Sequence, residues 1–334
     1  MDASLTWNYT DTYEYLERVR GGFPPLMITC ALNGGIQGKE GSEALPEKPE
    51  ELAQQAREAY EAGAVAVHVH PRDPSNWTNT ASDPDDFFEA NARIRELCPD
   101  LIINNTTGGG PSWTMETRFR IIEADPELAS LNMGPDMSRF VVKPRPASFE
   151  HPHDGFVYDD CIPFTYAIIE ELAGRMRERG IKPEMEIYQP GQFWVTQSLI
   201  EKELVEPPYL HQFVMGYQTS SFATPQALLD LVRELPEHSI FFVCGVGTTQ
   251  LPMTTTAMLL GGHVRVGLED NLYYARGRKF RGNGEAVERA VRIARELNRE
   301  IATPAQAREM LGISATPSTY AVKPSERVTT TTPS

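Results

Sequence analysis

Two histidines at alternate positions, His68 and His70, stand at the end of the apolar run AVAVHVH. In a β-strand, side chains two residues apart project from the same face, so both imidazoles would point to one place. Imidazole is the commonest side-chain ligand for metals such as zinc. The spacing therefore indicates a shared metal ion, with an ordinary half-buried, hydrogen-bonded histidine pair as the alternative.

A second group of charged residues ends another apolar run, in the segment HVRVGLED. Glu269 is the natural third metal ligand, because two histidines and one carboxylate leave a coordination position open, as catalytic zinc sites do. Arg265 and Asp270 flank this glutamate. They are candidates for proton transfer, although a structural ion pair at the rim of the fold would use the same residue types.

Polar residues end two further runs. Asn105, Thr106 and Thr107 lead into Gly108 in the segment NNTTGGG, where exposed backbone N–H groups could hold a carboxylate. Glu186 lies within the run EMEIY and is a candidate acid. These residues extend the candidate site from a metal to a bound anionic substrate.

The elements that must position these side chains alternate regularly along the chain. Strand-like runs begin near eight residues: Leu26, Ala64, Leu101, Leu128, Glu184, Gln212, Ser239 and His263. Helical periodicity fills the intervals, and Pro49, Pro84 and Pro225 mark helix starts. The pattern predicts an α/β fold, an eight-stranded parallel β/α (TIM) barrel, with an open doubly wound sheet as the alternative.

A barrel makes a positional prediction, because catalytic groups sit at the carboxyl ends of its strands. His68 and His70 end the second run, the threonines end the third, and Glu269 follows the eighth. Strands two and eight flank strand one in such a barrel. Their ends should therefore converge and bring the three metal ligands together.

The chain divides into three parts on this interpretation. Residues 26–312 form the barrel domain. Residues 1–25 are an aromatic and acidic extension, expected as an arm over the surface or over a neighbouring subunit. Residues 313–334 are rich in Thr, Pro and Ser and are expected to form a mobile tail.

Composition narrows the class of partner. The formal net charge of −15 argues against nucleic acid or an anionic membrane, since both favour basic surfaces. No apolar run is long enough to span a bilayer, and the amino terminus has no secretory pattern. The four cysteines lie far apart, which is typical of reduced thiols. We therefore expect a cytoplasmic protein that binds small molecules.

Several segments together resemble one enzyme family. They read LMITCALNGG, LPEKPEEL, EAGAVAVHVHPRDP, DLIINNTTGG, MEIYQPGQ and HVRVGLEDNLYYARG, and they span about residues 26 to 312. They look like the β-keto acid cleavage enzymes, whose founding activity cleaves 3-keto-5-aminohexanoate. The resemblance implies a zinc-dependent β/α barrel that reacts a β-keto acid with acetyl-CoA, giving acetoacetate and the CoA ester of the remaining acyl group. It also favours a homo-oligomer, in particular a tetramer.

The resemblance also implies roles for individual residues. His68, His70 and Glu269 match the zinc ligands, and Arg265 with Asp270 matches the pair that starts the reaction. Thr106 or Thr107 would help to hold the substrate carboxylate, with Asn105 and Gly108 beside them, and Glu186 would be the acid on strand five. Asp270 would remove a C2 proton, zinc would stabilise the enolate, and a Claisen step followed by retro-Claisen cleavage would release acetoacetate.

One departure from the family pattern concerns specificity. Members that act on amino-substituted keto acids carry an acidic residue just after the first strand, where this chain has Ile36. The substrate side chain is therefore expected to be neutral or apolar, unless Glu40 or Glu43 reaches in from the same loop. The loop 74–81 and the long segment from Pro135 to Cys161 are expected to shape the pocket.

Weaker signals remain open. His151 and His153 repeat the HxH spacing around a proline, so surface solvation competes with a second metal. A basic cluster after the eighth strand could meet CoA phosphates or simply be solvated; it comprises Arg276, Arg278, Lys279 and Arg281.

Two other classes of protein compete with the resemblance. A metal-dependent amidohydrolase is also a barrel, but that class places HxH on strand one and draws further histidines from later strands. A non-enzymatic zinc-binding protein would need a closed set of four ligands.

Overall fold

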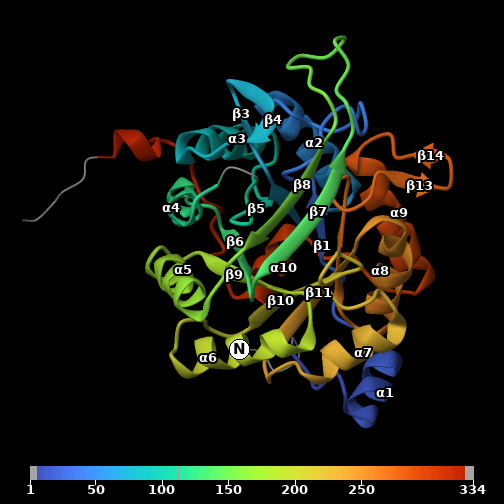
Figure 1. Cartoon of the computed structure of the whole chain (residues 1–334). Coiled ribbons are helices and arrows are strands. Elements are labelled where there is room, and N and C mark those ends of the chain that lie inside the picture. Colours follow the sequence, from blue (N-terminus) through green and yellow to red (C-terminus); the bar gives the residue numbers. More distant parts are fainter. Residues whose placement is uncertain (1–5, 111–112, 328–334) are drawn as a thin grey trace, which may run out of the picture.

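Eight parallel strands close into a barrel in the computed structural model, which describes residues 6–110 and 113–327. Their order around the barrel is β1-β2-β5-β6-β9-β10-β11-β12 (Figure 1). The strands are β1 Ile28–Ala31, β2 Ala66–Val69, β5 Ile102–Asn105, β6 Leu128–Asn132, β9 Lys182–Ile187, β10 Tyr209–Met215, β11 Ser239–Gly245 and β12 His263–Val266. Each of the eight predicted runs supplies one strand. Because β1 pairs with both β2 and β12, the barrel is confirmed and the open sheet is wrong.

Helices fill the intervals between the barrel strands. They are α2 Pro49–Ala62, α3 Pro84–Leu97, α4 Met115–Arg120, α5 Tyr166–Glu178, α6 Phe193–Glu201, α7 Pro225–Arg233, α8 Gln250–Leu259 and α9 Asn283–Glu296. Short 3₁₀ helices cover Ile121–Ala124, Pro190–Gln192 and Gly247–Thr249. The three predicted proline starts are confirmed at α2, α3 and α7, where the fixed φ of proline suits the first helical position.

The alternation of side chains along β2 decides which groups face the barrel interior. Val67 and Val69 belong to the apolar cluster that the strands share with the surrounding helices. His68 lies between them in sequence and therefore projects the other way, into the barrel, and His70 follows on the same side. The burial of two valines on one face thus orients two imidazoles on the other.

The amino-terminal ends of the strands are covered by segments outside the barrel pattern. Helix α10, Pro304–Leu311, packs its apolar side chains against the beginnings of the strands. The extension before β1 contains α1, Thr12–Gly21, which has no buried residue. Tyr9 anchors the extension instead, since its ring contacts Phe241 edge-on at 4.8 Å.

The carboxyl-terminal segment follows the outside of the barrel as far as Arg327. The backbone N–H of Ser318 donates to Glu127, and Ser325 donates to Asp85 at the start of α3. Arg327 forms an ion pair with Asp125 at 2.7 Å. This part of the segment expected to be mobile therefore makes specific contacts, whereas residues 328–334 lie outside the described residues.

Three small hairpins interrupt the barrel repeat. They are formed by β3 Arg72–Asp73 with β4 Asn76–Thr80, β7 Asp136–Val142 with β8 Phe156–Ile162, and β13 Tyr273–Ala275 with β14 Arg278–Lys279. Figure 1 shows the β7–β8 hairpin crossing in front of the barrel strands. Within the described ranges, no helix combines the length and the apolar character needed to cross a membrane.

Candidate active site

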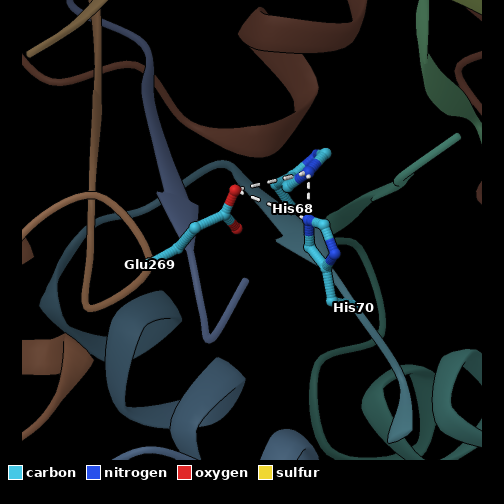
Figure 2. Close-up of side chains that lie close together, drawn as sticks. All are labelled: His68, His70 and Glu269. Atoms are coloured by element: carbon cyan, nitrogen blue, oxygen red, sulfur yellow. Dashed lines mark hydrogen bonds and ion pairs between the residues drawn. The ribbon is translucent and has the colours of Figure 1, made fainter. Parts of the chain in front are cut away.

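Three side chains that lie far apart in the sequence meet inside the mouth of the barrel. His68 and His70 from β2 approach Glu269, which follows β12 (Figure 2). The two Nε2 atoms lie 3.1 Å apart, and Glu269 Oε1 is 3.5 Å from His70 Nε2 and 4.0 Å from His68 Nε2. Within residues 6–110 and 113–327, these are the side chains that form a group able to hold a metal ion.

A tight backbone turn brings Glu269 to the histidines. Gly267 has a φ of 137°, and a Cβ at this position would lie 2.1 Å from the carbonyl oxygen of Ala31. Glycine alone allows this approach. The backbone N–H of Glu269 then donates to the same carbonyl oxygen at 3.2 Å, which ties the turn after β12 to the end of β1.

The ionisation states suit a divalent cation. Burial lowers the pKa of His68 well below its ordinary value, so its ring is neutral and can donate a lone pair. Burial opposes ionisation of Glu269, but the charge of Arg265 outweighs it and holds the pKa of Glu269 well below its usual range. Both Nδ1 atoms and Glu269 Oε2 are buried without a hydrogen-bond partner in the described structure. The two convergent Nε2 atoms and an ionised carboxylate with one unpartnered oxygen fit a bound metal.

Arg265 binds three carboxylates beside this group. Its guanidinium donates to Asp270 through Nε at 3.1 Å and Nη2 at 3.0 Å, and to Glu269 and Glu186 at 2.5 and 3.3 Å. Burial raises the pKa of Asp270 to about 6, although Arg265 acts in the opposite direction. Burial also raises the pKa of Glu186 to about 8. At neutral pH the site thus offers one carboxylate poised to accept a proton and one acid able to donate one.

A buried carboxylate below His68 was missed by the sequence analysis. Glu184 Oε2 lies 4.0 Å from His68 Nδ1 and accepts a hydrogen bond of 2.7 Å from the Asn104 side chain. A carboxylate near the second nitrogen of a metal-binding histidine fixes the orientation of the ring. The sequence held a signal for it, because Glu184 precedes Glu186 by two positions on one strand and must face the same way.

The candidate residues surround a cavity of about 480 Å³ at the carboxyl ends of the strands. Its lining includes His68, His70, Thr106, Gly108, Glu186, Arg265, Glu269 and Asp270. Asn105 and Thr107 are not among the lining residues, because neighbours on an extended chain alternate in direction. Thr107 Oγ1 instead donates to the backbone oxygen of Ser130 at 2.6 Å, whereas Thr106 Oγ1 accepts from the N–H groups of Gly108 and Gly109. Of the two threonines, Thr106 is therefore the one that faces the cavity. Asn105, which was expected to contact the substrate beside the threonines, does not face it.

The loop after β1 lacks a free carboxylate in the cavity. Ile36 and Glu40 both line it, but Glu40 Oε2 is bound by Arg145 at 2.9 Å. Glu43 is exposed and does not line it. The expectation that this loop offers no partner for a cation is consistent with these contacts.

The weaker candidates have other contacts. His153 Nδ1 lies 2.8 Å from the backbone oxygen of Asp154, and neither His151 nor His153 belongs to a metal-binding group of described residues. In the basic cluster, Arg278 and Arg281 both bind Glu285. The ammonium group of Lys279 donates to the backbone oxygen of Gly41 at 2.6 Å.

The site and the fold together define a class of protein. A closed β/α barrel whose strand ends carry three metal-ligand side chains, an arginine bound to carboxylates and an open cavity is the arrangement of a metal-dependent barrel enzyme. The histidine pair lies on β2, not on the first strand as in the amidohydrolase alternative.

Comparison with known proteins gives the family. The beta-keto acid cleavage enzyme family matches residues 25–313. The 3-keto-5-aminohexanoate cleavage enzyme of Acetoanaerobium sticklandii is 36% identical over 86% of this chain and 98% of its own. The 3,5-dioxohexanoate:acetyl-CoA acetone transferase of Paraburkholderia graminis is 32% identical over 86% of this chain and 95% of its own. The chain therefore belongs to the β-keto acid cleavage enzyme family, as the resemblance predicted.

A solved structure is similar in fold. The apo structure of ObcA superposes with a TM-score of 0.64 at 21% identity, covering 81% of this chain and 66% of that chain. At this identity the similarity concerns the barrel architecture alone.

Proposed function

We propose that this enzyme converts a β-keto acid and acetyl-CoA into acetoacetate and the CoA ester of the remaining acyl group. The observation that carries the proposal is the meeting of His68, His70 and Glu269 with the Arg265–Asp270 pair in one cavity of a family member. Atoms balance: R–CO–CH₂–COO⁻ and acetyl–S–CoA give acetyl–CH₂–COO⁻ and R–CO–S–CoA. The names of both curated relatives support this type of reaction.

His68, His70 and Glu269 would hold Zn²⁺ as the resident metal. When bound, zinc supplies a Lewis acid for the keto and carboxylate oxygens of the substrate. The two-histidine, one-carboxylate set supports zinc over magnesium or calcium, which prefer oxygen ligands. Glu184, whose Oε2 lies 4.0 Å from His68 Nδ1, would orient the ring by accepting a hydrogen bond from that nitrogen.

Asp270 is the proposed base that removes a proton from C2 of the β-keto acid. Its raised pKa of about 6 leaves it ionised at pH 7 yet more basic than an exposed aspartate. Arg265 fixes the carboxylate by two hydrogen bonds. Thr106 and the backbone N–H groups near Gly108 are proposed to orient the substrate carboxylate, and Glu186 to act as a proton donor.

We further propose a homotetramer that acts in the cytoplasm, where acetyl-CoA is available as co-substrate. The four cysteines form no disulfide and three of them are buried, which supports a reducing compartment such as the cytoplasm. Size-exclusion chromatography with light scattering tests the assembly: a mass of four chains agrees with the proposal, and a monomer contradicts it.

Product analysis tests the function. Purified enzyme is incubated with acetyl-CoA and a panel of β-keto acids, and acetoacetate and acyl-CoA are quantified by mass spectrometry with and without a chelator. We expect both products in equal amounts, a loss of both after chelation, and recovery with Zn²⁺.

The same assay separates the competing classes. An amidohydrolase would cleave amide or ester substrates without acetyl-CoA, and a non-enzymatic zinc-binding protein would form neither product. Turnover unchanged by complete removal of the metal would contradict the zinc proposal.

A further inference from the structure

The β7–β8 hairpin turns one face toward the cavity and the other away from the barrel. Phe140 and Tyr158 stand opposite each other on the two strands, and both line the cavity. Side chains alternate along a strand, so the neighbouring positions project from the opposite face of the hairpin. In Figure 1 the hairpin lies in front of the barrel strands, with this second face toward the viewer. We call it the outer face.

Six exposed side chains form the outer face, in three pairs that the register of the two strands sets opposite each other. The pairs are Met137 with Cys161, Arg139 with Asp159, and Val141 with Val157. Met137, Val141 and Val157 are 55%, 80% and 58% exposed. A pair of apolar side chains or of an apolar side chain and a thiol thus lies on each side of a central pair of opposite charges. Apolar side chains gathered in this way on a surface mark a site of contact with another molecule.

The edge of β7 is less available to a partner than this face. The Gln218 side chain accepts a hydrogen bond of 2.9 Å from the backbone N–H of Arg139 and donates to the backbone oxygen of the same residue. These are the groups through which another strand would extend the hairpin. A partner at this position would therefore contact the side chains of the outer face and not the backbone of β7.

The arrangement of charge identifies the partner as a second copy of the chain. Arg139 and Asp159 form an ion pair of 2.6 Å at the centre of the outer face, and both side chains are more than half exposed. A two-fold axis that runs along the hairpin between its two strands would place Arg139 of one copy over Asp159 of the other, and the reverse. An axis across the strands would instead oppose like charges. The outer face is therefore complementary to itself in one of these two orientations.

The same axis also matches the apolar positions. It sets Met137 of one copy against Cys161 of the other, because these residues are paired across the strands within each copy. For the same reason it sets Val141 against Val157. Every exposed side chain of the outer face thus meets one of its own kind.

We propose that the outer face of the β7–β8 hairpin is a two-fold interface between two copies of this chain, formed by its apolar pairs and by crossed Arg139–Asp159 ion pairs. The other face of the same two strands carries Phe140 and Tyr158 into the cavity. Association would therefore hold one side of both active sites in place. The interface does not depend on which β-keto acid the enzyme uses.

Two charge reversals test the interface. Arg139→Asp makes both central charges of the face negative, and Asp159→Arg makes both positive, so copies of either variant repel each other. We expect the mass of each variant, measured by size-exclusion chromatography with light scattering, to be half that of the wild type at the same concentration. An equimolar mixture of the two variants should regain the wild-type mass. Because the ion pair within each chain stays broken, recovery on mixing reports contact between copies.

Further variants separate this contact from a general loss of stability. Val157→Asp places a charge among the apolar pairs and should halve the mass without recovery on mixing with either charge variant. Arg233→Asp is the control, because Arg233 is exposed on α7, away from the hairpin, and should keep the wild-type mass. Thermal melting verifies that all four variants are folded.

The outcomes decide between the interface and other assemblies. A monomeric wild type, charge variants that keep the wild-type mass, or a mixture that does not recover it would each overturn the inference. A wild-type tetramer that none of the hairpin variants changes would contradict this interface alone and leave the proposed tetramer intact. A wild-type dimer that the charge variants convert to monomers, and that mixing restores, would support the interface and contradict the tetramer.

Discussion

At the scale of single residues, the central charged group of the candidate site is Arg265 with the carboxylates that it contacts. The side chain is only 4% exposed and contacts Glu186, Glu269 and Asp270. Four carboxyl groups, these three and Glu184, lie near one arginine and two histidines, and Glu269 and Asp270 are the two that are ionised at neutral pH. A divalent ion would add positive charge to this group, so the electrostatics of the site and the geometry of the ligands both favour a bound metal.

Replacing the proposed base tests its role directly. Asp270→Asn should lower kcat by about two to four orders of magnitude, the usual contribution of a positioned acid or base, and leave the metal content unchanged. In the wild type, kcat/KM should fall as the pH drops through about 6, because Asp270 must be ionised to accept a proton. Steady-state kinetics from pH 5 to 8 measure both effects.

The control for this substitution is Asp230→Asn, an exposed aspartate on α7 that pairs with Arg233. It should keep the activity and the pH profile of the wild type. Full activity in Asp270→Asn would rule out Asp270 as the base.

The metal ligands give a second prediction at this scale. His70→Ala removes one of three ligands and should reduce bound zinc from about one ion per chain to well below that, measured by elemental analysis after dialysis. His151→Ala is the matched control, because His151 belongs to no metal-binding group of described residues and should keep the full content. Zinc lost in His151→Ala and kept in His70→Ala would reverse the assignment.

At the scale of secondary-structure elements, one buried ion-pair cluster joins the β7–β8 hairpin to the loop after β1. Arg145, in the connection between the two strands, binds Glu40 at 2.9 Å and Glu47 at 2.7 Å. All three side chains are nearly inaccessible to solvent. The cluster ties the hairpin that crosses the barrel mouth to the loop after β1, so it links two sides of the cavity.

Breaking this cluster should be costly. Arg145→Ala leaves two buried glutamates without a counterion, and we expect a loss of about 3–5 kcal/mol in the free energy of unfolding, with a higher KM for the β-keto acid. Urea denaturation and steady-state kinetics measure the two effects. Arg233→Ala is the control, since its ion pair with Asp230 is exposed and should contribute at most about 1 kcal/mol. Equal losses in the two variants would refute the anchoring role.

At the scale of the whole molecule, closing the barrel brings together site residues that lie far apart in the sequence. His68 lies on β2 and His70 directly follows it, Glu269 follows β12, and β1 separates the two strands. An unfolded chain cannot keep residues so far apart in sequence within a few ångströms of one another. Metal binding should therefore favour the folded barrel strongly.

Thermodynamic linkage gives the size of the stabilisation expected from metal binding. Free Zn²⁺ at about one hundred times its Kd should raise the free energy of unfolding by about 2.7 kcal/mol, seen as a higher Tm by calorimetry. His70→Ala should lose most of this rise. An equal rise in that variant would mean that zinc acts at another site.

The barrel and much of the site could be predicted from the sequence because they depend on local patterns. Apolar runs separated by helix starts identified all eight strands, and the period of two along β2 oriented both histidines. The same period of two could have shown that Glu184 faces the site, because it lies two positions before Glu186 on one strand. It also distinguishes Thr106 from Thr107, but only once the facing direction of the strand is known.

Contacts between elements could not be predicted in this way. The pairing of Arg145 with Glu40 joins residues 105 positions apart, and the contact of Ser138 with Tyr217 depends on how a hairpin folds over the barrel. Neither follows from periodicity, because the path of an irregular connection is set by packing against the rest of the molecule.

The sequence alone determined that two imidazoles share a strand face, that a carboxylate pair ends the eighth strand, and that the chain belongs to a β/α barrel family. These properties are local, since backbone geometry and side-chain alternation impose them wherever the strand lies. Tertiary structure alone decided that Arg265 holds Glu186 together with Glu269 and Asp270, and that Arg145 binds Glu40 and Glu47. Those contacts exist only after the barrel closes, because closure brings distant segments within bonding distance of one another.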